Sequence, residues 1–265
     1  MNLMAKPFEK FFKPRREPEI SLSEEDGVRY LHFGSVWIQG AMRVRDPYGL
    51  ELEYTRELFA GLLLHPAPRN ITLLGLGAGS ASKFAWKSFP KAKVTTVELN
   101  PAVIAVARSQ FSLPAESKRM SVICGDAQEV IAGRPGMCDY LIVDLYDAAA
   151  RGPVLSSLEF YSACRAAMVA EGPAVMAVNL FGRHSSYETN LRNIGKAFDG
   201  RMLVQPPSER GNVIAFGFAG DVLEPKLTEL RVRASRLKEG LGLDFPRWLA
   251  GFKKANTLAG DQWKV

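Results

Sequence analysis

The fold is decided by Leu73-Leu74-Gly75-Leu76-Gly77-Ala78-Gly79-Ser80, an apolar run that ends in three alternating glycines. Continuous apolar runs of this kind are typical of strands that are buried on both faces of a parallel sheet. Glycines at alternate positions let the backbone turn sharply and approach a ligand closely, where a Cβ would collide. We therefore expect a strand, a ligand-binding glycine loop and then a helix over 81–89.

Downstream of this loop, strand-like apolar runs alternate with helical segments. The alternation predicts right-handed βαβ units and a mostly parallel sheet covered by helices on both faces, which is a Rossmann-like α/β fold. The further strands are expected at 93–99, 121–127, 139–147 and 173–181, with two closing strands at 202–207 and 212–220.

The regions before and after this alternation have different sequence patterns. Short β-rich runs separated by turn residues predict a small antiparallel β domain, whose last strand is expected at 36–44. A helix is expected over 54–64, before the prolines at 66 and 68. The expected domains are a basic flexible arm (1–19), the β-hairpin domain (20–53), the Rossmann-like catalytic domain (54–220) and a helical C-terminal extension (221–265).

Composition restricts the function classes. The net charge is +6 and the pI is about 9.2, but no nucleic-acid-binding motif accompanies the charge, so a nucleic-acid partner is not expected. No run reaches the ~18 apolar residues of a membrane span, and the basic start lacks the apolar core of a secretory signal, so the cytoplasm is the expected location. The three histidines are scattered, so no metal site is expected, and all three cysteines are expected to be buried.

Acidic residues follow the strands that surround the glycine loop. Glu98 ends the second strand, about twenty residues after the glycines, where a carboxylate can accept both ribose hydroxyls of a nucleoside. Asp126 ends the third strand, and Asp144 and Asp147 end the fourth. NAD is the competing ligand, but its loop has Gly-x-Gly-x-x-Gly spacing. The spacing of this loop, Gly-x-Gly-x-Gly-x-Ala, fits NAD less well. Gly125-Asp126-Ala127 is also the kind of sequence that S-adenosylmethionine-dependent enzymes use to hold the adenine amine, so an S-adenosylmethionine-type nucleoside is favoured.

With these residues assembled, the chain resembles the polyamine aminopropyltransferases, the spermidine synthase family. The resemblance extends from about 30 to 218. It is carried by Gln39 at a strand end followed by 53–57 (Glu-Tyr-Thr-Arg-Glu), by 96–104 (Thr-Val-Glu-Leu-Asn-Pro-Ala-Val-Ile), by 119–127 and by 139–147 (Asp-Tyr-Leu-Ile-Val-Asp-Leu-Tyr-Asp). It implies a class I S-adenosylmethionine-dependent transferase fold and a polyamine-forming enzyme that uses decarboxylated S-adenosylmethionine as co-substrate. It also implies a small amine as the second substrate and a homodimer.

The resemblance implies a role for each matching residue. Asp144 would be the catalytic acid–base group near the attacking amine, and Asp147 would help to hold that amine. Two acids three residues apart at a strand end suit a reaction in which an amine must be positioned and deprotonated. The donor-binding residues would be Gln39 and Tyr54 over the nucleoside and its tail, Glu98 and Leu99 at the ribose, Asp126 and Ala127 at the adenine, and Gly75, Gly77, Ala78 and Gly79 in the glycine loop.

Three positions depart from the family pattern. Ala78 stands where the family's glycine loop carries an aspartate that grips the ammonium of the donor. Ala148-Ala149-Ala150-Arg151-Gly152-Pro153 replaces the family's Asp-Pro-x-Gly-Pro, and Asn179 replaces a glutamine. Two alternatives follow: an S-adenosylmethionine-dependent methyltransferase on the same scaffold, favoured by Ala78, and a non-catalytic relative that only binds nucleoside.

Overall fold

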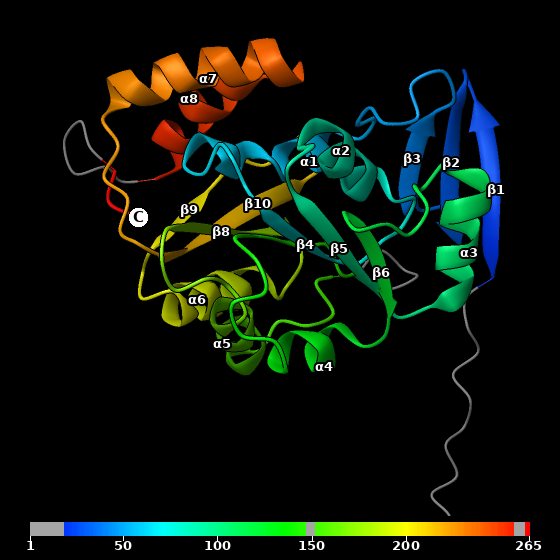
Figure 1. Ribbon diagram of the computed structural model, residues 1–265, viewed down its shortest axis with the longest axis horizontal. Helices are drawn as coiled ribbons and strands as arrows, with labels where there is room; N and C mark the ends of the chain where they lie inside the picture. Colours follow the sequence, from blue (N-terminus) through cyan, green and yellow to red (C-terminus); the bar gives the residue numbers. More distant parts are fainter. Residues whose placement is uncertain (1–18, 147–151, 257–262) are drawn as a thin grey trace, which may run out of the picture.

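The computed structural model describes residues 19–146, 152–256 and 263–265 and shows two sheets (Figure 1). The larger has seven strands in the order β6-β5-β4-β7-β8-β10-β9. All neighbours from β6 to β8 run parallel, and β10 runs antiparallel to both β8 and β9. The strands are β4 (Asn70–Leu74), β5 (Lys93–Glu98), β6 (Met120–Cys124), β7 (Tyr140–Val143), β8 (Pro173–Phe181), β9 (Met202–Val204) and β10 (Asn212–Gly220).

This strand order positions the functional site. The chain proceeds outward from β4 through β5 to β6, and then returns to the other side of β4 as β7. Ligands of open α/β sheets bind outside the carboxyl ends of the strands at such a reversal. The predicted Rossmann-like fold is confirmed, and within its mostly parallel sheet β10 alone runs antiparallel to its neighbours among the described strands.

Two apolar cores lie on the two faces of this sheet. Helices α4, α5 and α6 cover one face, and α2, α7 and α8 cover the other (Figure 1). The 3₁₀-helix η1 and helix α3 pack in the same core as α2, α7 and α8. The helices are α1 (Glu53–Glu57), the 3₁₀-helix η1 (Ala60–Leu63), α2 (Ser80–Ser88), α3 (Pro101–Gln110), α4 (Ala127–Ala132), α5 (Leu158–Ala166), α6 (Tyr187–Ala197), α7 (Leu227–Leu241) and α8 (Phe245–Ala255).

The prediction of a single helix over 54–64 is wrong, because the structure has two short helices there, α1 and η1. The carbonyl oxygen of Leu58 accepts a hydrogen bond of 2.8 Å from the Tyr140 hydroxyl instead of continuing the helix. Gly61 then lies against Val175 and Tyr140 of the sheet, where a Cβ would meet their side chains at 2.7 and 2.9 Å. Contacts with the sheet therefore override a local sequence pattern that is helical throughout.

The smaller sheet is an antiparallel meander of β1 (Ile20–Glu25), β2 (Val28–Phe33) and β3 (Gly40–Arg43). The expected strand at 36–44 is shorter in the structure, because pairing between β2 and β3 ends at Leu31 and Gly40. Residues 34–39 form a loop, in which Val36 is 90% exposed and Trp37 58% exposed.

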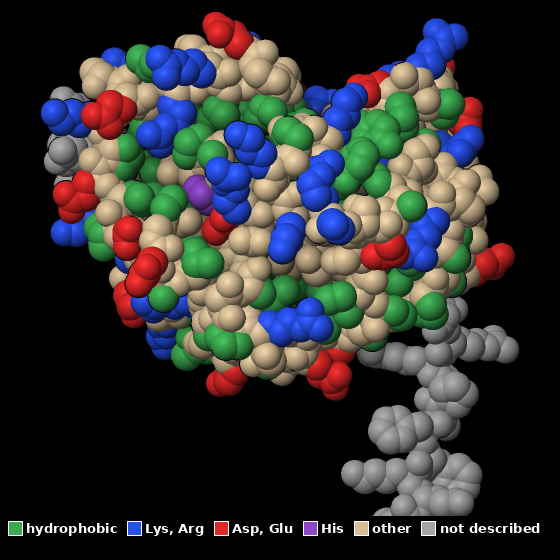
Figure 2. All heavy atoms as spheres, viewed as in Figure 1, with side chains coloured by type: hydrophobic (Ala, Val, Ile, Leu, Met, Phe, Trp, Pro, Cys, Tyr) green, Lys and Arg blue, Asp and Glu red, His purple; other side chains and the backbone are tan. Residues whose placement is uncertain are grey.

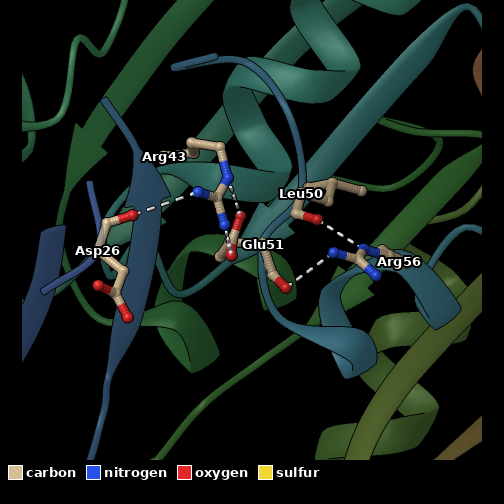
Figure 3. Close-up of polar contacts among 5 residues, drawn as sticks. All are labelled: Asp26, Arg43, Leu50, Glu51 and Arg56. Carbon is tan, nitrogen blue, oxygen red and sulfur yellow. Dashed lines mark hydrogen bonds and ion pairs between the residues drawn. The ribbon is translucent and has the colours of Figure 1, made fainter. Parts of the chain in front are cut away.

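Two arginines hold the segment that joins the smaller sheet to α1 (Figure 3). Arg43 binds both carboxylate oxygens of Glu51, at 2.5 and 3.1 Å, and donates to the carbonyl oxygen of Asp26. Arg56 donates to the carbonyl oxygens of Leu50 and Glu51 at 2.6 and 2.9 Å. Bidentate arginine–carboxylate pairs fix geometry as well as charge, so these contacts set the direction in which the chain enters α1.

Surface properties agree with the sequence in part. Lys and Arg side chains are spread over the face seen in Figure 2, with apolar and uncharged atoms between them. In the described part of the chain, no helix combines the length and the apolarity required to cross a membrane.

Cys138 and Cys164 are buried, but Cys124 is exposed. The expectation for Cys124 is wrong because it ends β6, the edge strand of the large sheet.

Candidate active site

A cleft of about 1430 Å³ runs along the carboxyl ends of the parallel strands. Its floor is the glycine loop and the ends of β5 to β8, and its rim includes the 34–39 loop and the start of α1. The sequence-predicted residues that line it are Gln39, Tyr54, Gly75, Gly77, Ala78, Glu98, Leu99, Asp126, Ala127 and Asp144. Gly79 precedes α2 and faces Leu113 instead. Asp147 lies outside the described residues.

The glycine loop is clamped between two other parts of the site. Gly75, Gly77 and Gly79 all have positive φ, a backbone conformation that residues other than glycine adopt only at a cost in free energy. A Cβ on Gly75 would overlap the carbonyl oxygen of Asp144, and one on Gly77 would lie 2.9 Å from that of Gln39. The loop therefore sits directly on the backbone of both Asp144 and Gln39.

Ala78 packs against the smaller sheet. A Cβ built on Gly40 would lie 2.6 Å from the Ala78 Cβ, and Ala78 is only 2% exposed. Two residues on, the Ser80 hydroxyl donates to the carbonyl oxygen of Ala41 at 2.8 Å. Position 40 therefore has no room for a Cβ, and the alanine is part of the contact between the loop and β3.

Glu98 is held by the backbone on both carboxylate oxygens. Its Oε2 accepts from the Leu76 N–H at 3.1 Å and its Oε1 from the Asn100 N–H at 2.9 Å. Each carboxylate oxygen has a second lone pair, so the group remains able to accept hydroxyl donors. Leu99, 66% exposed, places an apolar surface beside it.

Asp126 has a structural task as well. Its Oδ1 caps α4 by accepting from the N–H groups of Gln128 and Glu129, at 2.7 and 3.4 Å. No hydrogen-bond partner of its Oδ2 is found among the described residues, and Asp126 and Ala127 both line the cleft. The carboxylate is thus fixed in orientation at the β6 side of the cleft.

Asp144 lies at the centre of the cleft, directly after β7. Its Oδ1 accepts from Asn179 Nδ2 at 2.9 Å and its Oδ2 from the Tyr54 hydroxyl at 3.3 Å. Burial raises the pKa of the Asp144 carboxyl, and the hydrogen bonds from Asn179 and Tyr54 lower that pKa in part. Burial and the nearby Asp144 charge raise the pKa of Tyr54 well above its ordinary value. Asp144 is therefore a desolvated carboxylate whose two oxygens are held in a fixed orientation.

Of the side chains behind Asp144, Asn212 was not predicted from the sequence, whereas Asn179 was noted there only as a departure from the family pattern. Asn179 Oδ1 accepts from Asn212 Nδ2 at 3.0 Å, and the Tyr146 hydroxyl donates to the Asn179 carbonyl at 3.2 Å. Asn212 starts β10, and in a parallel strand its start would lie at the opposite edge of the sheet. The antiparallel pairing of β10 with β8 brings Asn212 to the cleft instead.

The described residues contain no group of three or more His, Cys, Asp or Glu side chains arranged to hold a metal ion. The polar atoms that face the cleft are carboxylates, amides and hydroxyls held on fixed strand ends. Such a set can bind a nucleoside and accept a proton from a reacting group.

Comparison with known proteins identifies the family. No family model matches the chain. The chain is 34% identical over 249 residues to a polyamine aminopropyltransferase of Neisseria meningitidis serogroup A, covering 94% of each protein. The chain belongs to the polyamine aminopropyltransferase family. A second polyamine aminopropyltransferase, from Chromobacterium violaceum, is 32% identical over 255 residues and is covered to 96% of its length.

Solved structures show the same fold. A probable spermidine synthase from Corynebacterium glutamicum has the same fold, with a TM-score of 0.68 and 20% identity, over 91% of this chain and 94% of that one. Human methyltransferase-like protein 13 in complex with SAH matches with a TM-score of 0.63 and 25% identity, over 72% of this chain. Because aminopropyltransferases match over nearly the whole chain, the findings support aminopropyl transfer over the methyltransferase alternative.

The titration of Asp144 gives a first test in this aminopropyltransferase. Replacing Tyr54 with phenylalanine removes a hydrogen bond that stabilises the Asp144 carboxylate and lowers its pKa. The pKa of Asp144 should then rise further, so the acid limb of the kcat/KM profile should move to higher pH. Tyr48→Phe, outside the cleft, is the control. An acid limb that stays in place, or moves to lower pH, would contradict a base role for Asp144.

Proposed function

We propose that this enzyme transfers the aminopropyl group of decarboxylated S-adenosylmethionine to a small primary amine, with Asp144 as the proton acceptor. The observation that supports this most is the position of Asp144, a desolvated carboxylate with two fixed hydrogen bonds in the middle of the cleft. The nucleoside residues Glu98 and Asp126 lie on the β5–β6 side of it, and β8 and β10 lie on the other side.

The donor would occupy the β4–β6 side of the cleft. Glu98 would accept the ribose hydroxyls with Leu99 against the base, and Asp126 would accept the adenine amine through its uncommitted Oδ2 beside Ala127. Gln39 and Tyr54 would lie over the sulfonium and its tail, because both line the cleft next to the glycine loop. Asp147, which ends the same segment as Asp144, is proposed to help hold the acceptor amine.

The reaction is a single displacement. The neutral amine nitrogen attacks the propyl carbon bonded to sulfur, a C–N bond forms and the C–S bond breaks. The electron pair of the broken bond stays on sulfur, so the positive sulfonium becomes the neutral thioether methylthioadenosine. The attacking nitrogen loses one proton to Asp144. Alignment of donor and acceptor accounts for much of the rate, since a held, in-line pair avoids the entropy cost of a bimolecular encounter.

Electrostatics favours the decarboxylated donor. Ordinary S-adenosylmethionine carries an additional carboxylate on its tail, which would be brought close to the buried carboxylate of Asp144. Like charges in a partly desolvated site repel strongly. The decarboxylated tail carries only an ammonium, which Asp144 attracts. This preference does not require an aspartate in the glycine loop, so it is compatible with Ala78.

Calorimetric titration with decarboxylated S-adenosylmethionine, S-adenosylmethionine and methylthioadenosine tests the proposal. We expect the decarboxylated donor to bind at least about tenfold more tightly than S-adenosylmethionine, a difference of ~1.4 kcal/mol. With an amine present, methylthioadenosine should accumulate in equal amount to the aminopropylated product. Tighter binding of S-adenosylmethionine with methylated product would support the methyltransferase alternative, and binding of none of the three would contradict the nucleoside site.

A further inference from the structure

The Asn179 amide can face Asp144 in two opposite orientations. The two ends of an asparagine amide have nearly the same shape, but Nδ2 donates hydrogen bonds and Oδ1 accepts them. Nδ2 stabilises an ionised carboxylate, whereas Oδ1 would accept a hydrogen bond from the neutral acid and stabilise that form instead. In the structure, Asn179 Nδ2 donates to Asp144 Oδ1 at 2.9 Å. The groups that select this orientation therefore affect whether Asp144 is ionised.

A backbone carbonyl, which can only accept, sets the direction of the hydrogen bonds behind Asn179. The Tyr146 hydroxyl donates its single proton to the Asn179 carbonyl oxygen at 3.2 Å. With that proton committed, the Tyr146 oxygen can only accept from its other partner, Asn212. Burial raises the pKa of Tyr146, and the hydrogen bond with Asn212 lowers that pKa in part, as a bond donated to the phenol oxygen does. Asn212 must therefore present its Nδ2 to Tyr146.

Asn212 passes the same direction on to Asn179. An amide nitrogen carries two hydrogens, and Asn212 Nδ2 also donates to Asn179 Oδ1 at 3.0 Å. With its oxygen engaged there, the Asn179 side chain has only Nδ2 to offer Asp144. The order of donors and acceptors is thus determined from Tyr146 through Asn212 and Asn179 to the Asp144 carboxylate.

Main-chain contacts hold Asn212 in place. In the pairing of β8 with β10, Asn179 lies opposite Ile214, which puts Asn212 diagonally beside Asn179 on the same face of the sheet. The Asn212 N–H donates to Ser208 Oγ at 3.1 Å, and the Asn212 carbonyl accepts from the Ser208 N–H at 2.7 Å. The position of the Asn212 amide is therefore fixed by contacts that do not involve Asp144.

We propose that Asn212 and Tyr146 are positioning residues that keep the Asn179 amide donating to Asp144. This rests on the proposed function, in which Asp144 accepts the proton of the attacking amine. The fixed direction denies the neutral acid an acceptor in Asn179, so it favours the carboxylate before the reaction, when the base must be free of its proton. Without it, Asn179 can turn over, and the neutral acid gains a hydrogen bond.

Other ionisable groups also face this part of the cleft. Tyr54 on α1 donates to Asp144 Oδ2 at 3.3 Å. The remaining ionisable side chains among the described cleft residues, besides Tyr146, are Glu53 on α1, Glu98 at the end of β5, Asp126 after β6, His184 after β8 and Arg210 before β10. Asp147 lies outside the described residues. A neutral substitution at Asn212 leaves all of these groups in place, so a shift in the titration of Asp144 reports on the direction of the network.

Asn212→Leu tests the proposal, because leucine has nearly the shape of asparagine but neither donates nor accepts. The carboxylate of Asp144 loses its preference and the pKa of Asp144 rises, so the base becomes protonated at higher pH. We expect the acid limb of the kcat/KM profile to move to higher pH by about half a unit to one unit, the effect of one ordinary hydrogen bond. The same amine is used throughout, so that its own titration is common to every variant.

Tyr146→Phe gives a second test. Removing the hydroxyl leaves Asn212 and Asn179 able to turn over together, so the acid limb should move in the same direction. Asn256→Leu is the control, because it loses hydrogen bonds to Val204 and Phe252 outside the cleft. This control should lower stability and leave the acid limb in place.

A double-mutant cycle shows whether Asn212 acts through Asn179. Asn179→Leu alone should move the acid limb to higher pH, and adding Asn212→Leu should then produce no further shift. A further shift as large as that of Asn212→Leu alone would overturn the proposal, because Asn212 would then act on Asp144 without Asn179.

The proposal and the proposed function fail in different ways. If Tyr54→Phe moves the acid limb but neither Asn212→Leu nor Tyr146→Phe does, Asp144 remains the base, and Asn212 and Tyr146 are not positioning residues. If Asp144→Asn retains most of the kcat of the wild type, the proposed function itself loses its proton acceptor.

Discussion

Asp144→Asn is expected to lower kcat by about 10²–10⁴-fold, the range that a positioned acid–base group contributes. Asparagine has the shape of aspartate but cannot take a proton from the attacking amine. The affinity for methylthioadenosine should change little, because we propose that this neutral nucleoside is bound through Glu98 and Asp126 and not through the charge of Asp144. The measurement is kcat with saturating donor, together with the calorimetric Kd for methylthioadenosine.

Two further results make this prediction decisive. Asp26→Asn makes the same chemical change in the exposed turn between β1 and β2 and should leave kcat unaltered. An Asp144→Asn enzyme that binds methylthioadenosine normally but retains a kcat within about tenfold of wild type would exclude Asp144 as the base. The proton would then have to leave by another route, such as water.

Gly75→Ala is expected to damage both stability and the site. Gly75 has a φ of +97°, and an added Cβ would overlap the carbonyl oxygen of Asp144. Backbone strain of this kind costs about 1–3 kcal/mol, and the overlap adds to it, so the free energy of unfolding should fall by about 2–4 kcal/mol. For a protein of this size the melting temperature should drop by roughly 5–15 °C.

Gly136→Ala separates the two causes. Gly136 also has positive φ, +67°, but a Cβ there would meet no atom within 4 Å. Gly136→Ala should lower the free energy of unfolding by about 1 kcal/mol, the effect of the backbone conformation alone. If Gly75→Ala is no worse than Gly136→Ala and still turns over substrate, the close approach of the glycine loop to Asp144 is not important.

The sequence predicts best what local chemistry determines. Alternating apolar runs and helices predict the parallel sheet, and because parallel strands end at one edge, Glu98, Asp126 and Asp144 were expected to share a cleft, as the structure shows. The roles assigned to these residues, the domain limits, a homodimer and a cytoplasmic location stay predictions.

What the sequence missed depends on contacts between distant segments. The predicted helix over 54–64 is interrupted because the hydroxyl of Tyr140, about 80 residues later, donates a hydrogen bond to the carbonyl oxygen of Leu58. Asn212 reaches Asn179 only because β10 is antiparallel, which an apolar run does not reveal.

The contact between Gly40 and Ala78 has a consequence for how this enzyme can evolve. The two positions share one small volume, so the residue allowed at either is set by the size of the other. A residue larger than glycine is excluded at position 40 for as long as position 78 carries a Cβ and β3 keeps its place. Natural variation at 40 and 78 should therefore be coupled, with a larger residue at 40 only where 78 is glycine.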